Sequence, residues 1–215
     1  ANRNGFFYVL DRVTGKFLLG LPFAKVNWAS GLDKNGRPIQ TPQPVGAPTW
    51  PGNQGGTNWY TPSFSPRTGL FYVTAWEGVH AAFKKTEAEY EEGKRFTGGL
   101  TLPTRIGTRG PQIASKNPDD GYGAVRALDP VTGEKKWEFK MNDVSASGIL
   151  TTATDLLFTG SREGFFQALD ARNGKLLWRV NAGGEIAMGP ITYSVNGKQY
   201  VAFSASSSLF VYALK

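Results

Sequence analysis

The sequence contains no cysteine and a single histidine, His80, among its 215 residues. Without cysteine, these residues hold no disulfide, no Cys-X-X-Cys-His haem attachment site, no iron–sulfur cluster and no thiol nucleophile. A zinc site built from the usual nitrogen and sulfur ligands is not expected with one histidine. No metal ligands are assigned within the chain, since the carboxylates Asp119, Asp120 and Asp155 also lack the spacing and closing Glu of a calcium loop.

Long apolar runs and basic blocks are also missing. No stretch of about 18 apolar residues is present, so no membrane span is expected. The first residues, 1–5, lack a charged-then-apolar signal pattern, although a cleaved signal stays open. The 24 Lys and Arg against 17 Asp and Glu give a net charge of +7. Because these cations are scattered, the charge suggests an acidic partner or an anionic ligand, and not nucleic acid.

The residues that are abundant indicate an all-β fold. The chain has 27 Gly and 13 Pro, together with 6 Trp, 8 Tyr and 14 Phe, and 40% of it is hydrophobic. Gly and Pro are typical of tight turns, and aromatic residues favour half-buried pleated surfaces. We expect a folded chain of one or two domains, rich in strands and turns.

An internal repeat defines the period of these strands. The pattern Ala-x-Asp-x-x-x-Gly-x-x-x-Trp recurs after 41 residues, from Asp129 to Asp170 and from Trp137 to Trp178. A weaker copy runs from Val9 to Leu19, with Asp11 in the place of the repeat Asp and Leu19 in the place of Trp. Each copy predicts a hairpin in which Asp caps the turn and Gly takes positive φ. The period is that of one four-stranded propeller blade.

Further segments complete the pattern or interrupt it. Strands are predicted over 156–160, 164–169, 191–195, 199–203 and 209–214, with a hairpin turn at Asn196-Gly197. Residues 76–117 are expected to be an insertion that contains a short polar helix over 84–95. Residues 27–56 are expected to be a long loop between strands.

The repeats and several other segments carry a family resemblance. They include 2–11, 22–28, Gly55-Gly56-Thr57-Asn58-Trp59, 157–164 and 197–202. Over nearly the whole chain the sequence resembles the C-terminal part of the pyrroloquinoline quinone (PQQ)-dependent alcohol dehydrogenases of the methanol and ethanol dehydrogenase type. The resemblance implies about the last four blades of an eight-bladed propeller, forming one partial domain over 1–215. The repeat Trp residues, Trp137 and Trp178, are implied to stack on the backbone of neighbouring blades.

The resemblance also implies site residues. Arg3 occupies the place of the Arg or Lys that faces the quinone oxygens, where a guanidinium suits a developing oxyanion. Asn58 matches an amide that reaches the cofactor, and Trp59 an aromatic that lines its pocket. Phe158 stands where some relatives place an aromatic near the cofactor. The alternatives are a surface Arg near a chain end, a turn-capping Asn beside an interior Trp, and a strand Phe in the core.

Other family residues have no counterpart in this chain. The catalytic Asp, the Glu and Asn ligands of Ca²⁺ or a lanthanide, the stacking Trp and the Cys pair are implied to lie upstream of Arg3. We therefore expect one part of a longer or split enzyme. Alone, it is expected to be inactive and to self-associate or require a complementing fragment, because open blade edges pair with other chains.

The implied reaction is oxidation of a primary alcohol by hydride transfer to PQQ, with cytochrome c as the electron acceptor and the periplasm as the compartment. Two alternatives stay open. One is a non-catalytic propeller that acts as a scaffold or protein-binding module. The other is a PQQ enzyme of smaller ring, such as an aldose dehydrogenase.

Overall fold

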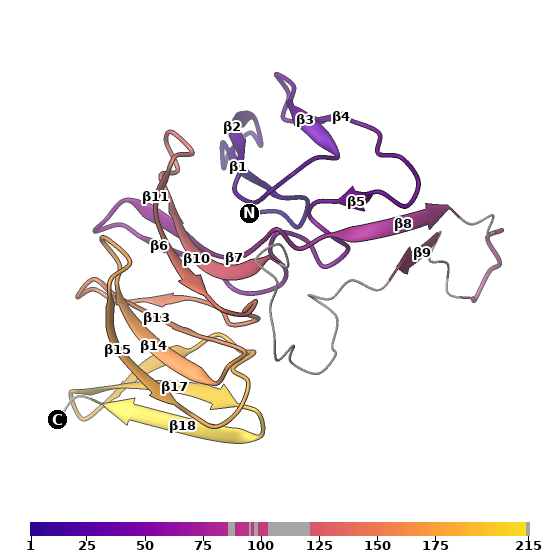
Figure 1. Ribbon diagram of the computed structural model, residues 1–215. Helices are drawn as coiled ribbons and strands as arrows, with labels where there is room; N and C mark the ends of the chain where they lie inside the picture. Colours follow the sequence, from indigo (N-terminus) through magenta and orange to yellow (C-terminus); the bar gives the residue numbers. More distant parts are fainter. Residues whose placement is uncertain (86–88, 95, 97–98, 103–120, 214–215) are drawn as a thin grey trace. The chain divides into compact units, whose positions relative to one another are not determined.

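The computed structural model describes residues 1–215 except 86–88, 95, 97–98, 103–120 and 214–215 (Figure 1). The described residues are strands, turns and loops, with no helix among them. They group into two compact units. The first contains Ala1, 57–76 and 122–215, and the second contains 2–56 and 77–121. The extent of the domain and of the insertion over 76–117 remains a prediction.

Three antiparallel sheets make up the first unit. Their strand orders are β11-β10-β7-β6, β12-β13-β14-β15 and β16-β17-β18. The strands are β6 (Ser63–Ser65), β7 (Leu70–Glu77), β10 (Tyr122–Leu128), β11 (Lys135–Met141), β12 (Leu150–Thr151), β13 (Leu156–Gly160), β14 (Phe165–Asp170), β15 (Leu176–Asn181), β16 (Ile191–Val195), β17 (Lys198–Ala205) and β18 (Ser208–Ala213). The five strands predicted after residue 150 are all present, and each of their bounds lies within two residues of the predicted one.

The second unit has three smaller sheets, β1-β2, β3-β4 and β5-β8-β9. Its strands are β1 (Phe6–Leu10), β2 (Phe17–Pro22), β3 (Ala29–Leu32), β4 (Pro38–Gln40), β5 (Pro48–Thr49), β8 (Ala81–Lys85) and β9 (Gly99–Leu102). The expectation of an uninterrupted loop over 27–56 is wrong, because β3, β4 and β5 lie within it. The turn after β3 is fixed by Asp33, whose main-chain N–H donates to Arg37 O at 2.8 Å, and by Gly36 at φ +78°.

The short helix predicted over 84–95 is also wrong. Lys84 and Lys85 belong to β8, which pairs with β9, and residues 92–93 form a turn. Residues 86–88 and 95 lie outside the described part of the chain. The segment KKTEAEYEEGKR offers helix-forming residues but almost no apolar face. Because a helix of this length is marginal without such packing, strand pairing prevails over local propensity.

The three repeated hairpins form in one common register. Ala127 faces Trp137, Ala168 faces Trp178 and Val9 faces Leu19, and each pair lies beside a register shift. In each turn the Asp carbonyl accepts a hydrogen bond from the Gly N–H at 2.7–2.8 Å. The three glycines have φ between +70° and +75°, which a residue with a side chain rarely adopts. The turn chemistry predicted from Asp and Gly is confirmed.

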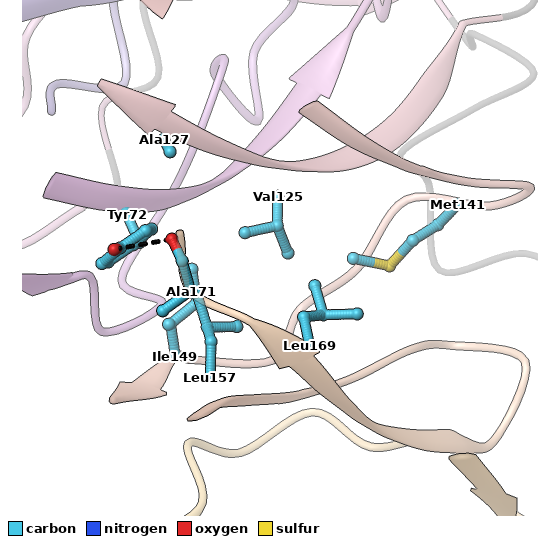
Figure 2. Close-up of a cluster of buried hydrophobic side chains, with 8 residues drawn as sticks. All are labelled: Tyr72, Val125, Ala127, Met141, Ile149, Leu157, Leu169 and Ala171. Atoms are coloured by element: carbon cyan, nitrogen blue, oxygen red, sulfur yellow. Dashed lines mark hydrogen bonds between the residues drawn. The ribbon is translucent and has the colours of Figure 1, made fainter. Parts of the chain in front are cut away.

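Neighbouring sheets of the first unit pack face to face. One core cluster joins the β11-β10-β7-β6 sheet to the β12-β13-β14-β15 sheet, and Figure 2 shows its side chains converging. It contains Tyr72, Val125, Ala127, Met141, Ile149, Leu157, Leu169 and Ala171. A second cluster joins the sheet of β14 to that of β17, where the Phe166 and Phe203 rings stack with centroids 3.7 Å apart. The sheets are therefore held together mainly by apolar packing.

Both repeat Trp residues reach from one sheet to the next, and the predicted contact with the neighbouring backbone is seen for Trp137. Trp137 Nε1 donates to Ala171 O at 3.1 Å, across from its own sheet. Its ring lies so close to Gly174 that a Cβ at that glycine would come within 2.5 Å of it. Trp178 makes an edge contact with Tyr212 of β18, with centroids 5.6 Å apart. Both tryptophans thus have a structural role.

One ion pair in this unit is almost fully buried. Arg126 Nε and Glu138 Oε2 lie 2.6 Å apart on paired strands, and their side chains are 4% and 11% exposed. Lys135 Nζ lies 3.1 Å from the same carboxylate oxygen, and the Tyr122 hydroxyl donates to the other at 3.1 Å. Burial raises the pKa of Glu138, but the hydrogen bonds and charges of Arg126 and Lys135 outweigh it, so the pKa lies below its ordinary value.

We expect Arg126→Met to lower the free energy of unfolding by about 2 kcal/mol. Removing one partner of a buried pair typically costs about 3–5 kcal/mol, and here Lys135 and Tyr122 still contact the carboxylate. Chemical denaturation measures the change. The double variant R126M/E138L should recover most of it, because no buried charge is left unpaired. If Arg126→Met has the same free energy of unfolding as the wild type, the ion pair between Arg126 and Glu138 does not stabilise the fold.

Asp170 makes the stability of its hairpin depend on pH. Arg172 Nε and Nη2 donate to its carboxylate at 2.9 and 2.7 Å, and the Arg172 main-chain N–H adds a third bond. These hydrogen bonds, chiefly those of the Arg172 side chain, lower the pKa of Asp170 to about 2 from 3.8. A carboxyl group whose pKa is lower in the folded state stabilises that state above its unfolded pKa. This contribution is lost as the pH falls from about 4 towards 2.

Asp170→Asn should therefore lower the Tm at pH 7, and its difference from the wild type should shrink as the pH falls from 4 to 2. Thermal unfolding across this range tests the prediction. Asp129→Asn is the matched control, since Asp129 holds the same turn position but has Val131 two residues later, where Asp170 has Arg172. Asp129→Asn should lower the Tm at pH 7 by less than Asp170→Asn does. A D170N difference that stays constant from pH 7 to 2 would contradict the assignment.

Candidate functional site

Arg3 lies in the second unit, in the turn that precedes β1. Its side chain is exposed, and Nη2 donates to the carbonyl oxygen of Asn53. Its own carbonyl oxygen accepts from Gly56 N at 3.0 Å. A Cβ at Gly56 would lie 2.9 Å from Ala24 Cβ, so this position is closely packed. The arginine is thus hydrogen-bonded, through both its main chain and its guanidinium, to the segment that leads into Thr57.

Asn58 and Trp59 lie in the first unit, in the segment that precedes β6. The Asn58 side-chain oxygen accepts from the Trp59 main-chain N–H at 2.9 Å, which fixes the orientation of the carboxamide. The Trp59 side chain is 63% exposed, so the interior position offered as its alternative is wrong. Its ring lies 5.1 Å from that of Tyr60, and Tyr60 in turn stacks on the buried Trp76 at 5.8 Å. The exposed Trp59 ring is therefore supported by the ring of Tyr60, which itself packs on the buried Trp76.

Phe158 lies in the middle of β13, between Leu150 and Ala168 on the paired strands. Its ring stacks on Phe166, with centroids 5.8 Å apart and planes 10° apart, and it packs against the second core cluster. This position agrees with a strand residue of the core. A contact between Phe158 and a cofactor stays a prediction.

Thr57 is a residue that the sequence did not reveal. It is 4% exposed, and its Oγ1 is buried without a hydrogen-bond partner among the residues that the structure describes. The segment 55–59 suggested Asn58 and Trp59, but nothing in the sequence shows that the intervening hydroxyl is buried. Whether the Thr57 hydroxyl is buried, and whether it has a partner, depends on residues distant in the sequence, so no local pattern predicts it.

His80 has a structural environment in the second unit. Its ring lies 5.4 Å from that of Trp50, whose Nε1 donates to Gly78 O at 2.8 Å. Lys25 Nζ lies 3.8 Å from the Trp50 ring centroid. In the described ranges, no group of three or more His, Cys, Asp or Glu side chains is placed to hold a metal ion. The same ranges contain no helix of the length and apolarity that a membrane crossing requires.

Comparisons with known proteins identify the chain. The family model for the glucose/ethanol/alcohol dehydrogenase β-propeller domain, designated PQQ, matches residues 140–201. Quinoprotein alcohol dehydrogenase PedH of Pseudomonas putida is 38% identical, over 94% of this chain and 34% of its own length. The chain belongs to the quinoprotein alcohol dehydrogenases. It matches the C-terminal part of these proteins and spans about a third of their length.

Two further family members agree with this assignment. The 1-butanol dehydrogenase (cytochrome c) of Thauera butanivorans is 36% identical, over 95% of this chain and 30% of its own length. A solved structure, a europium-containing methanol dehydrogenase, superposes with a TM-score of 0.80 at 35% identity, over 94% of this chain and 35% of its own. The antiparallel sheets are thus those of a quinoprotein β-propeller. The number of blades, eight, stays a prediction.

The residues present fit a quinone that carries carboxylates. PQQ has three carboxylates and an ortho-quinone, all of which accept hydrogen bonds. The second unit offers an exposed guanidinium at Arg3, and the first unit offers a fixed carboxamide at Asn58 and an exposed indole at Trp59. Each of these groups is of a kind that suits such a ligand.

Proposed function

We propose that this chain is the C-terminal part of a PQQ-dependent dehydrogenase that oxidises primary alcohols and passes the electrons to a cytochrome c. The observation that carries the proposal is 38% identity to a quinoprotein alcohol dehydrogenase over 94% of the chain. The name of the Thauera relative supports an alcohol substrate and cytochrome c as the acceptor.

In this proposal the chain contributes binding and electrostatics. When bound, PQQ would supply the redox chemistry as a hydride acceptor. Arg3 places a permanent positive charge and several N–H donors at the quinone oxygens, where negative charge develops. Asn58 orients the ring by hydrogen bonding, and Trp59 covers it with an apolar surface that excludes water.

The metal ion is assigned to the longer enzyme. The family resemblance implies that the ligands of Ca²⁺ or a lanthanide lie upstream of Arg3. The europium-containing relative supports a lanthanide as one of the two choices. We assign the enzyme to the periplasm from the resemblance, and self-association or a complementing fragment stays a prediction.

Alcohol-dependent electron transfer tests the proposal. The full-length native gene product, loaded with PQQ and with Ca²⁺ or a lanthanide, should reduce cytochrome c when a primary alcohol is added. The 215-residue chain alone, loaded in the same way, should show no activity. If the full-length product binds PQQ but reduces no acceptor with any primary alcohol, the substrate class is wrong. If it binds no PQQ, the scaffold alternative is correct.

A further inference from the structure

The guanidinium of Arg3 is held by a main-chain carbonyl. Its Nη2 donates to the carbonyl oxygen of Asn53, an exposed residue in a tight turn. This turn is closed by the Gly55 N–H, which donates to Gly52 O at 2.9 Å. The position of the guanidinium therefore depends on where the turn over 52–55 lies, whatever side chain residue 53 carries.

Gly52 fixes this turn on its buried side. Its N–H donates to Val79 O at 3.0 Å, in the segment that leads into β8. A Cβ at Gly52 would lie 2.7 Å from His80 C and 3.0 Å from Ala81 N, so the two main chains are in direct contact. Val79 and Ala81 are 3% and 1% exposed, and a closely packed segment has little room to move aside. All of these residues belong to the second unit.

We propose that Gly52 is a positioning residue for Arg3. Because Gly52 has no side chain, the turn lies directly against the main chain of residues 79–81. This contact sets the place of the Asn53 carbonyl, and with it the place of the guanidinium that donates to it. The inference rests on the proposed function, in which Arg3 faces the quinone oxygens. An arginine has five N–H donors in one plane, so one can be anchored at Asn53 while others reach a ligand.

Two variants of the full-length native gene product, loaded with PQQ and with Ca²⁺ or a lanthanide, test this role by kcat for alcohol oxidation per bound PQQ. Gly52→Ala should displace the turn and lower kcat about tenfold, since misplacing a group at the reaction by about 1 Å can cost 10²-fold. Asn53→Gly adds no atom and keeps the carbonyl, but it loosens an exposed turn, so kcat should fall about two- to threefold. Gly20→Ala is the matched control, because its Cβ would crowd the Leu32 side chain in the same unit, and its kcat should be that of the wild type.

The same substitutions in the Arg3→Met background separate positioning from a general loss of stability. If Gly52 acts through Arg3, R3M/G52A and R3M/N53G should keep the kcat of R3M within about twofold, because the two effects are not additive. Wild-type kcat in G52A overturns the inference, and so does an equal loss in both backgrounds. If G52A does not fold, N53G is judged by the same two criteria. A full-length wild-type protein that oxidises no alcohol refutes the proposed function itself, so the two failures are distinguishable.

Discussion

Replacing Arg3 by Met should lower kcat for alcohol oxidation by the full-length enzyme about 10²-fold at saturating PQQ. The guanidinium is exposed and anchored to Asn53 O, and its charge faces no acidic partner in any described ion pair. Removing one preorganised donor from a developing oxyanion typically costs about 10²–10³-fold in kcat. Met keeps the length of the side chain, so the change isolates the charge and the N–H donors.

Two control variants test whether the loss of kcat is specific to the guanidinium of Arg3. Arg3→Lys keeps the charge but loses the planar fork of donors, so its kcat should fall between those of Met and the wild type. Arg12→Met removes an exposed arginine from the turn after β1 and should leave kcat unchanged. Steady-state kinetics with one alcohol and a fixed acceptor give all three values. An R3M enzyme with wild-type kcat would show that Arg3 is a surface residue only.

Tyr72→Ala should be among the most destabilising single substitutions in the chain. Tyr72 is fully buried between two sheets, and its hydroxyl donates to Ala171 O at 2.9 Å, the contact drawn in Figure 2. Its ring also lies 5.6 Å from that of Trp137. Truncating a large buried aromatic leaves a cavity and costs about 3–5 kcal/mol, because the surroundings relax only in part.

The contributions of ring and hydroxyl can be separated. Tyr72→Phe keeps the ring and should cost only about 1 kcal/mol, since Trp137 Nε1 still donates to Ala171 O. Val131→Ala, at an 83% exposed turn position, should change stability by less than about 0.5 kcal/mol. Urea denaturation measures the series. Equal losses in Y72A and Y72F would contradict a packing role for the ring.

The features predicted well from the sequence are those fixed by local chemistry. The Asp and Gly of each repeat specify the hairpin turn, and the period of 41 residues places Trp137 and Trp178 in the same register. At Asn196-Gly197 both residues have positive φ, as the dipeptide predicts. These signals are short-range, so they do not depend on the rest of the fold.

The errors came from features that depend on distant contacts. The segment over 84–95 has helix-forming residues, yet β8 pairs with β5 and β9. The loop over 27–56 contains β3, β4 and β5, which are too short to give a clear alternating pattern. At the site, Arg3, Asn58 and Trp59 were suggested by family resemblance. The burial of the Thr57 hydroxyl, without a partner among the described residues, depends on the tertiary structure and could not be read from the sequence.

The most direct test of the account is a PQQ titration of the full-length native gene product, followed by calorimetry. We predict saturable binding with one PQQ for each chain, and weaker binding in the Asn58→Ala variant. Absence of saturable binding in the presence of Ca²⁺ and of a lanthanide would contradict the account and leave a propeller that serves another purpose.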